Sequence, residues 1–189
     1  TYNRASFIDK AIQSALNQTY DNYEIVVVDD GSTDNTEDIV SKFNSPKIRY
    51  IKKNHEGAPF TRNRAVREAN GEFIRWLDSD DILHSSILKE YEQCLRTYDD
   101  FDILYCDNVR YYSSQNREEI AKYPSFNGKI PPVKFLGGPP IPNVGTLIKK
   151  TLFEEIGYYN TDFLRAHDYE FWVRAAGVAR FRHCPKLLY

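Results

Sequence analysis

Carboxylate side chains gather at two places along the chain, each directly after a run of apolar residues. Asp78, Asp80 and Asp81 stand within four positions after "FIRWL", and Asp29 and Asp30 follow "IVVV". Like charges this close repel one another, which disfavours ionising all of them together. A counter-charge must therefore compensate, or the side chains must be solvated.

The apolar runs predict the elements that position these acids. An unbroken apolar run bounded by Asp, Gly and Ser, as in "YEIVVVDDGS" at residues 23–32, is typical of a strand buried on both faces of a parallel sheet. In open α/β sheets, ligands bind at the carboxyl ends of the strands, where both acidic groups fall. If the two strands are neighbours, these carboxylates share one edge of the sheet, and a divalent cation would balance their charge.

Carboxylate oxygen suits Mg²⁺ or Mn²⁺, which keep coordination positions for substrate phosphates. An EF-hand calcium loop is a poorer match, because neither run has its Asp/Asn spacing, its sixth-position Gly and its closing Glu. The alternative for each cluster is an exposed turn or a helix cap, which Asp, Ser, Gly and Thr commonly form. One cluster alone would favour that alternative, whereas two clusters at the ends of two buried strands favour a binding site.

Strands and helices alternate through the first half of the chain, which indicates an open α/β sheet. Besides the strand within 23–32, apolar periodicity predicts strands at 47–53, 73–77 and 102–112. It also predicts helices at 7–16, 33–43, 60–71 and 85–98. The helix at 33–43 is expected to be capped by Asp34 or Thr33. Residues 123–143 are rich in Pro and Gly and hold no convincing element. A strand at 145–150 and helices at 151–157 and 168–177 are predicted to follow.

Composition limits the class of protein. A chain of 189 residues fits one domain with a substantial core. A net charge of −2 without a basic stripe argues against a nucleic-acid partner. Cys94, Cys106 and Cys184 indicate reduced thiols in a cytosolic protein. No apolar run is long enough to span a membrane. Peripheral membrane association through a missing segment stays open. The chain has no Met and opens on "TYNR", which resembles the end of a strand, so we expect it to be part of a longer product.

Five motifs then occur in an order and spacing that resembles the inverting glycosyltransferases of family two: "TYNR", "VVVDDGSTDNT", "EGAPFTRNRA", "GEFIRWLDSDD" and "AHDYEFWVRAA". The resemblance implies a GT-A fold, with a Rossmann-like, mostly parallel sheet flanked by helices and a less regular C-terminal part. It implies one catalytic domain over 1–189, with a nucleotide-binding half at 1–110 and an acceptor-binding half at 111–189. The first apolar strand expected before "TYNR" is missing.

By this resemblance, the residues expected to bind the nucleotide are Thr1, Tyr2, Arg4, Asp29, Asp30, Ser32, Arg62, Asp78 and Ser79. Asp30 matches the acid that accepts a hydrogen bond from the base imide, and an ionised carboxylate can only accept. Uracil, thymine and guanine all offer a suitable N–H, so the base stays open, with UDP favoured. Arg62 matches the residue that approaches the base or the diphosphate. Its alternative is a solvated helix charge, which we favour for Arg64 and Arg67.

The metal ion implied by the resemblance is Mn²⁺ or Mg²⁺. Asp80, the last acid of the Asp-Ser-Asp triplet, is its expected ligand. Asp81 is expected to assist or to cap the next helix, and Asp78 to face the ribose or a metal-bound water. The cation would stabilise the negative charge left on the β-phosphate when the sugar departs, a Lewis-acid effect of several kcal/mol.

A transfer reaction also needs a base that deprotonates the acceptor hydroxyl. The resemblance singles out Asp168, with Glu170 as runner-up and His167 framing the site. The alternative for Asp168 is a plain helix cap. Gly137 and Gly138, in the Pro-rich loop, are expected to form the acceptor-side wall. The other histidines show no ligand spacing and are expected at the surface or in packing; they are His55, His84 and His183.

The leading hypothesis is therefore inverting transfer of a sugar from a nucleotide-diphosphate sugar to a hydroxyl of a carbohydrate or glycolipid acceptor, in surface polysaccharide or glycoconjugate synthesis. We expect it in the cytoplasm or at the inner face of the membrane, and the oligomeric state stays open. One alternative is a metal-dependent sugar-nucleotide nucleotidyltransferase, although "TYNRASF" lacks the glycines of a phosphate loop. The other is a nucleotide- or carbohydrate-binding module without turnover.

Overall fold

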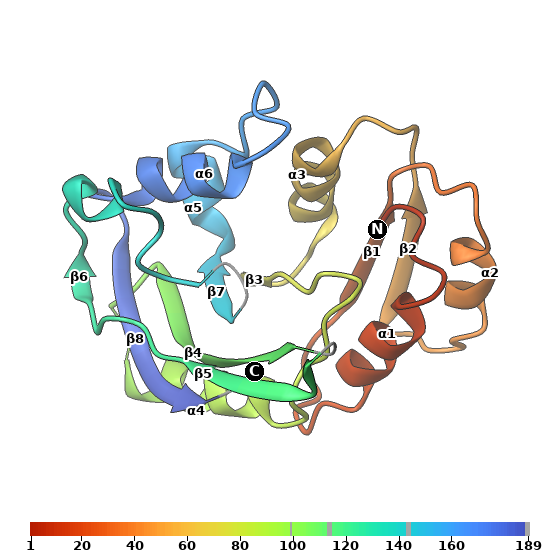
Figure 1. Ribbon diagram of the computed structural model, residues 1–189, viewed down its shortest axis with the longest axis horizontal. Coiled ribbons are helices and arrows are strands. Elements are labelled where there is room, and N and C mark those ends of the chain that lie inside the picture. The colour runs from red at the N-terminus through yellow and green to blue at the C-terminus, as the bar shows by residue number, and fades with distance from the viewer. Residues whose placement is uncertain (99, 113–114, 143–144, 188–189) are drawn as a thin grey trace.

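A small parallel sheet carries the first acidic group. The computed structural model describes residues 1–98, 100–112, 115–142 and 145–187. Strand β1 (Ile25–Asp29) pairs in parallel with β2 (Ile48–Lys52). Helices α1 (Ile8–Leu16) and α2 (Thr36–Ser41) cover one side of this pair through a cluster of buried apolar residues, and α3 (Ala58–Glu68) contacts β1. Figure 1 shows this group of elements on the right of the molecule.

A second, mixed sheet runs in the order β3-β7-β4-β8-β6, with β5 paired to β4. Its strands are β3 (Phe73–Arg75), β4 (Ile103–Tyr112), β5 (Arg117–Ala121), β6 (Asn127–Lys129), β7 (Thr146–Lys149) and β8 (Arg180–Leu187). The predicted α/β class with flanking helices is confirmed. The parallel arrangement predicted for the sheet holds for the pairs β1–β2 and β4–β8, whereas β3–β7, β4–β7, β4–β5 and β6–β8 are antiparallel. The short connection from β4 to β5 permits only an antiparallel pair.

Strand β4 lies at the centre of the core, because it is buried on both faces. Ile103 and Tyr105 face one apolar cluster, and Leu104 and Cys106 face another, as expected from the alternation of side chains along a strand. Helices α5 (Lys150–Ile156) and α6 (His167–Ala175) cover the first face, and α4 (Ile87–Thr97) covers the second. All three cysteines are buried free thiols. Within the described ranges, no helix is long and apolar enough to cross a membrane.

The predicted helices and strands of the first half are present with ends shifted by a few residues. The first correction concerns residues 123–143, which contain β6 and the 3₁₀ helix η2 (Pro132–Phe135); Asn143 lies outside the described residues. The second concerns β5 and β8, which were not predicted. The N-cap of α2 is Asn35, although the Asp34 carboxylate still accepts the Thr36 N–H at 3.0 Å.

A slot separates β1 from β3. The Thr1 amino group donates to the Val28 carbonyl at 2.7 Å, and the Asp30 N–H donates to the Thr1 carbonyl at 2.9 Å, which is the bonding pattern of a parallel strand pair. Upstream of this point, the edge of β1 that faces away from β2 lines a cavity of about 1310 Å³. Apolar residues from α1, β1, β3 and α4 form much of its wall, among them Ile12, Val26, Ile74 and Leu95.

Candidate active site

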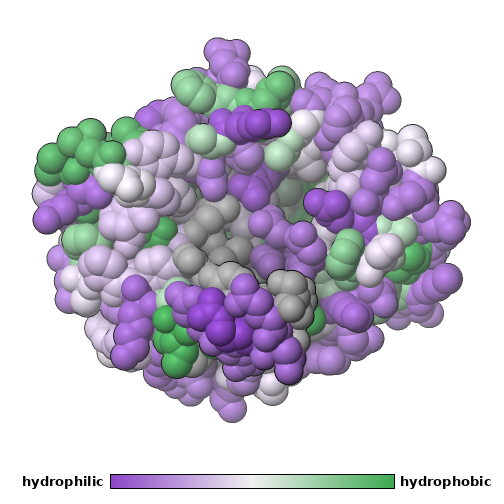
Figure 2. Space-filling view, in the orientation of Figure 1, coloured by the Kyte–Doolittle hydropathy of each residue, from purple (hydrophilic) through white to green (hydrophobic). Residues whose placement is uncertain are grey.

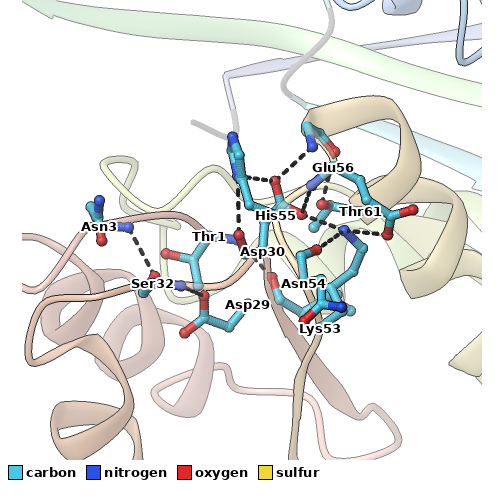
Figure 3. Close-up of polar contacts among 12 residues, drawn as sticks. Thr1, Asn3, Asp29, Asp30, Ser32, Lys53, Asn54, His55, Glu56 and Thr61 are labelled. Carbon is cyan, nitrogen blue, oxygen red and sulfur yellow. Dashed lines mark hydrogen bonds and ion pairs between the residues drawn. The ribbon is translucent and has the colours of Figure 1, made fainter.

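The Asp30 carboxylate, just beyond the end of β1, is held by donors from one loop (Figure 3). Its Oδ1 accepts from the Lys53 ammonium and from the Glu56 N–H at 3.0 Å. Its Oδ2 accepts from the Gly57 N–H at 2.8 Å and lies 2.8 Å from the Nδ1 of His55. Burial alone would raise the pKa of Asp30, but the hydrogen bonds from Lys53 and these backbone groups hold the pKa below its ordinary value.

Asp29 supports the turn after β1 and is fully buried. Its Oδ1 accepts the Ser32 N–H at 2.8 Å, and its Oδ2 accepts the Tyr50 hydroxyl. The Ser32 hydroxyl in turn accepts the Asn3 N–H at 2.9 Å (Figure 3). The structure therefore ties the "TYNR" segment to the end of β1, as expected if both contribute to one site.

The ring of Tyr2 stacks on the ring of His55, with 4.1 Å between the ring centroids. Tyr2 is exposed, and it lines the large cavity together with Thr1, Arg4 and Asp30. From the sequence we expected His55 at the surface or in packing. Its side chain is exposed, and its Nδ1 also lies 2.8 Å from Oδ2 of the predicted base-binding acid. "KKNHEG" carries no metal-ligand or triad spacing, so only the three-dimensional contact with Asp30 identifies it.

Arg62 connects the second acidic group to the C-terminal helix. From α3, it donates to Asp78 Oδ1 at 3.1 Å and to His167 Nε2 at 3.2 Å, and its guanidinium lies 5.6 Å from the Trp76 ring centre. Its side chain is only 17% exposed, so it is no solvated helix charge. Arg64, by contrast, is half exposed and pairs with Glu68, as favoured from the sequence.

Asp80 is exposed, lines the cavity with Asp78 and Ser79, and has no hydrogen bond or ion pair among the described residues. The Asp81 N–H donates to the Asp78 carbonyl, which makes the acidic run a tight turn. No group of three or more His, Cys, Asp or Glu side chains in the described part of the chain could hold a metal by itself. These acids could hold Mn²⁺ or Mg²⁺ only together with a bound substrate. Both ions accept one or two protein carboxylates and complete their coordination shell with phosphate oxygens and water.

Asp168 and His167 lie in the first turn of α6, which begins after Ala166 in a left-handed conformation. Asp168 is therefore not the helix cap. His167 is buried, and its pKa is lowered by that burial and then by Arg62, while Asp168 and Asp78 both act to raise it. Both carboxylates therefore act on the same imidazole, although His167 and Asp168 do not line the large cavity themselves.

Glu170 is engaged elsewhere. Its two oxygens accept from Arg174 at 2.6 and 2.9 Å, and Arg174 also donates to the carbonyls of Gly157 and Tyr158. This arrangement fastens α6 to the end of α5.

Gly137 and Gly138 follow η2 at the surface, and Gly138 has a φ of 114°, which favours glycine. Neither glycine would bring an added Cβ within 4 Å of another atom. The Tyr169 hydroxyl donates to the Phe135 carbonyl, which links this loop to α6 beside Asp168.

Acids from two strand ends therefore open into one cavity. Thr1, Tyr2, Asp30, Arg62, Asp78 and Asp80 all line it, whereas Asp168 is joined to it through His167 and Arg62. Figure 1 shows α3 and α6 on the same side of the two sheets, facing each other across this region.

Comparison with solved structures identifies the fold. The structure superposes on TarS of S. aureus with a TM-score of 0.81 and 25% identity over the whole of this chain and 57% of that one. TarS has also been solved with UDP-GlcNAc. The mannosyltransferase PcManGT of Pyrobaculum calidifontis, solved with GDP-Man and Mn²⁺, matches with a TM-score of 0.74 and 21% identity, over all of this chain and 54% of that one. The fold is of the GT-A type found in glycosyltransferases.

The family follows from the sequence match. The family model described as Glycosyl transferase family 2 matches residues 1–157, so the chain belongs to this family. An uncharacterised glycosyltransferase of Rickettsia prowazekii (strain Madrid E) is 29% identical over 188 residues, which are 92% of this chain and 55% of that protein. The chain thus spans little more than half the length of this relative and about a third of some others, and the family match ends before α6.

Proposed function

We propose that this chain transfers a sugar, with inversion, from a nucleotide-diphosphate sugar to an acceptor hydroxyl, and that the donor is a UDP-sugar. The observation that carries this proposal is that Asp30 and Asp80, from two different strand ends, line one cavity with Arg62 beside them. The solved complex of TarS with UDP-GlcNAc supports uracil as the base. Family membership favours glycosyl transfer over the nucleotidyltransferase alternative.

In this proposal, Tyr2 and Asp30 recognise the base, and Asp80 holds Mn²⁺ or Mg²⁺ together with the diphosphate. The cation, when bound, would withdraw charge from the leaving β-phosphate. Arg62 lies where its positive charge would also face the diphosphate, since it lines the cavity beside Asp78. The complex of PcManGT with GDP-Man and Mn²⁺ supports the choice of a divalent cation.

Asp168 is the proposed base. It would take the proton of the acceptor hydroxyl as the new bond forms between that oxygen and the anomeric carbon of the sugar. The bond between the anomeric carbon and the diphosphate breaks on the opposite face, which gives inversion. His167 stays neutral beside it, because Arg62 donates to its Nε2 and the pKa of His167 is lowered. The pairing of Glu170 with Arg174 supports Asp168 over Glu170 in this role.

The acceptor is proposed to approach along the loop after η2. Tyr169 ties this loop to α6, and exposed apolar residues lie on both sides of that helix, Val133 and Leu136 at η2 and Phe163 and Leu164 before α6. Figure 2 shows these hydrophobic areas at the upper left and the top of the molecule. They suit an acceptor with a lipid part in glycoconjugate or polysaccharide synthesis. The cytoplasm or the inner face of the membrane stays our prediction for the location.

Titration calorimetry with UDP and Mn²⁺ tests the proposal. Asp80→Ala should weaken Mn²⁺-dependent UDP binding by roughly tenfold or more, because the cation loses its protein carboxylate while the nucleotide contacts remain. Asp38→Ala, which removes an exposed carboxylate from α2, is the matched control and should bind as the wild type does. Unchanged Mn²⁺-dependent affinity in Asp80→Ala would remove the metal assignment.

A further inference from the structure

The Asp30 carboxylate has little capacity left for a nucleobase. Each oxygen already receives two donors, from Lys53, Glu56 and Gly57 and from His55. The Glu56 and Gly57 groups are backbone N–H and cannot leave without moving the start of α3. The Lys53 side chain is 15% exposed, whereas the His55 side chain is 55% exposed. His55 is therefore the donor that a ligand can replace at the smallest cost.

The two contacts of the His55 ring match those expected of a base. Its Nδ1 lies 2.8 Å from Asp30 Oδ2, and its face stacks on Tyr2 at 4.1 Å with 24° between the ring planes. A pyrimidine base likewise offers a planar ring and an imide N–H at its edge. Figure 3 shows the imidazole beside the Asp30 carboxylate, with dashed lines to that carboxylate and to the Asp30 carbonyl.

Contacts with Asp30 and close packing against Gly31 fix the position of the His55 ring. His55 Nδ1 also lies 3.1 Å from the Asp30 carbonyl, so the side chain is held by two oxygens of one residue. Gly31 has a φ of 80°, and a Cβ there would lie 3.0 Å from the His55 backbone nitrogen. The glycine thus lets the loop at His55 pack closely against the end of β1.

We infer that the His55 imidazole and the nucleobase compete for one place, between the Tyr2 ring and Asp30 Oδ2. This inference rests on the proposed nucleotide site and adds an intramolecular competitor to it. His55 must rotate outward before the base can stack on Tyr2 and donate to Asp30. The apparent affinity for nucleotide then equals the intrinsic affinity multiplied by the fraction of molecules in which His55 has swung away.

Calorimetry with three proteins and two probes tests this competition. In the presence of Mn²⁺, His55→Ala should bind UDP roughly three- to tenfold more tightly than the wild type, since a competitor that fills the place 70–90% of the time lowers affinity by about that factor. Inorganic pyrophosphate has no base, so its affinity should be the same in both proteins. His84→Ala, an exposed histidine that contacts Ser86, is the control and should leave both affinities unchanged.

Equal or weaker UDP binding by His55→Ala overturns the inference while the nucleotide site stands. Absence of UDP binding in all three proteins overturns the proposed site and the inference with it. A tighter pyrophosphate affinity in His55→Ala would also contradict competition for the base. As a second measurement, the imidazole NMR signals of His55 in the wild type should shift on adding UDP and stay in place on adding pyrophosphate. A static His55 signal with UDP bound overturns the inference.

Discussion

Asp168 and Glu170 stand two positions apart in the first turns of α6, and their partners differ. Asp168 Oδ1 accepts only its neighbour's backbone N–H in the described structure, from Tyr169 at 2.9 Å. Glu170 is held by both nitrogens of the Arg174 fork. A carboxylate in a bidentate pair with Arg is a poor proton acceptor, because protonation would break both charge-assisted bonds. The residue expected to move a proton is therefore Asp168.

We expect Asp168→Asn to lower the rate of sugar release from a UDP-sugar by roughly 10²–10⁴-fold, which is the usual contribution of a general base. UDP affinity should change little, since Asp168 does not line the cavity. Glu170→Gln is the matched control: it should lower thermal stability, because Arg174 loses its ion pair, but keep turnover per folded molecule. Rate assays with UDP-GlcNAc and other UDP-sugars measure the turnover of both variants. A Glu170→Gln enzyme as slow as Asp168→Asn would contradict the assignment.

Arg62 influences the protonation of its neighbour. Burial lowers the pKa of His167, and the Arg62 charge lowers it further. In Arg62→Met, the positive charge is gone while the apolar stem can remain, so the pKa of His167 should rise. NMR titration of the His167 ring measures the shift. Arg64→Met, which removes an exposed arginine paired with Glu68, should leave the His167 titration curve in place. A fall in the pKa of His167 in Arg62→Met would contradict the charge effect.

At the scale of elements, the helices could be predicted from the sequence, whereas half of the strands in the second sheet could not. α1 and α4 carry apolar residues at helical spacing, and β1 and β4 are apolar runs that find a buried place in the fold. β5 is "REEIA" and largely exposed, β6 is only Asn127–Lys129, and β8 includes Pro185 among basic residues. Such strands form through pairing with β4 and β8 rather than through their own pattern.

The candidate site divides in the same way. The acids could be proposed from the sequence because they end apolar runs, and Arg62 could be proposed from its motif. The structure brings Arg62 into contact with Asp78 and His167, and the binding roles of these residues stay predictions. His55 and Lys53 were missed, because their role depends on where the loop after β2 returns to Asp30. Contacts between residues far apart in the sequence leave no local signal in a single chain.

The slot between β1 and β3 leads to a prediction about strand order. Strand geometry turns the N–H and C=O of Val26 away from β2 and toward the cavity, in line with the bonds that Thr1 makes to Val28 and Asp30. A chain that continued upstream from Thr1 as a strand would run parallel to β1 and place apolar side chains against α1 and α4. We predict that this slot accepts a strand that pairs in parallel with β1.

Fusing five residues rich in Val and Ile ahead of Thr1 should therefore stabilise the protein. Side-chain burial and the new hydrogen bonds to β1 favour the ordered segment, and the entropy of ordering five residues opposes most of this gain. We expect a net gain on the order of 1 kcal/mol, which for a protein of this size corresponds to a rise in Tm of roughly 2–4 °C in a thermal melt. A Gly-Ser extension of equal length is the control and should leave Tm near that of the unextended chain. Equal melting of the two fusions would show that the slot does not select a strand.

At the scale of the whole molecule, Asp30 joins elements that are distant in sequence. It accepts bonds from the loop after β2 and from the start of α3, and its own N–H bonds to Thr1. Its pKa is held below the ordinary value, so the folded protein favours the ionised form more than the unfolded chain does. Folding stability from this group is thus present above the unfolded pKa of about 3.9 and is lost as the pH falls through the lower folded value.

Asp30→Asn should therefore be less stable than the wild type at pH 7, and the difference should shrink as the pH approaches 2. The amide keeps the shape of the side chain but offers only one acceptor oxygen to four donors and has no charge for Lys53. Urea unfolding at a series of pH values gives the free energy of unfolding of both proteins. Asp38→Asn, at an exposed position on α2, should follow the wild-type curve. If the Asp30→Asn and wild-type curves ran parallel down to pH 2, the ionised carboxylate would not be what joins β1 to α3, and the bonds seen around it would have to act through shape alone.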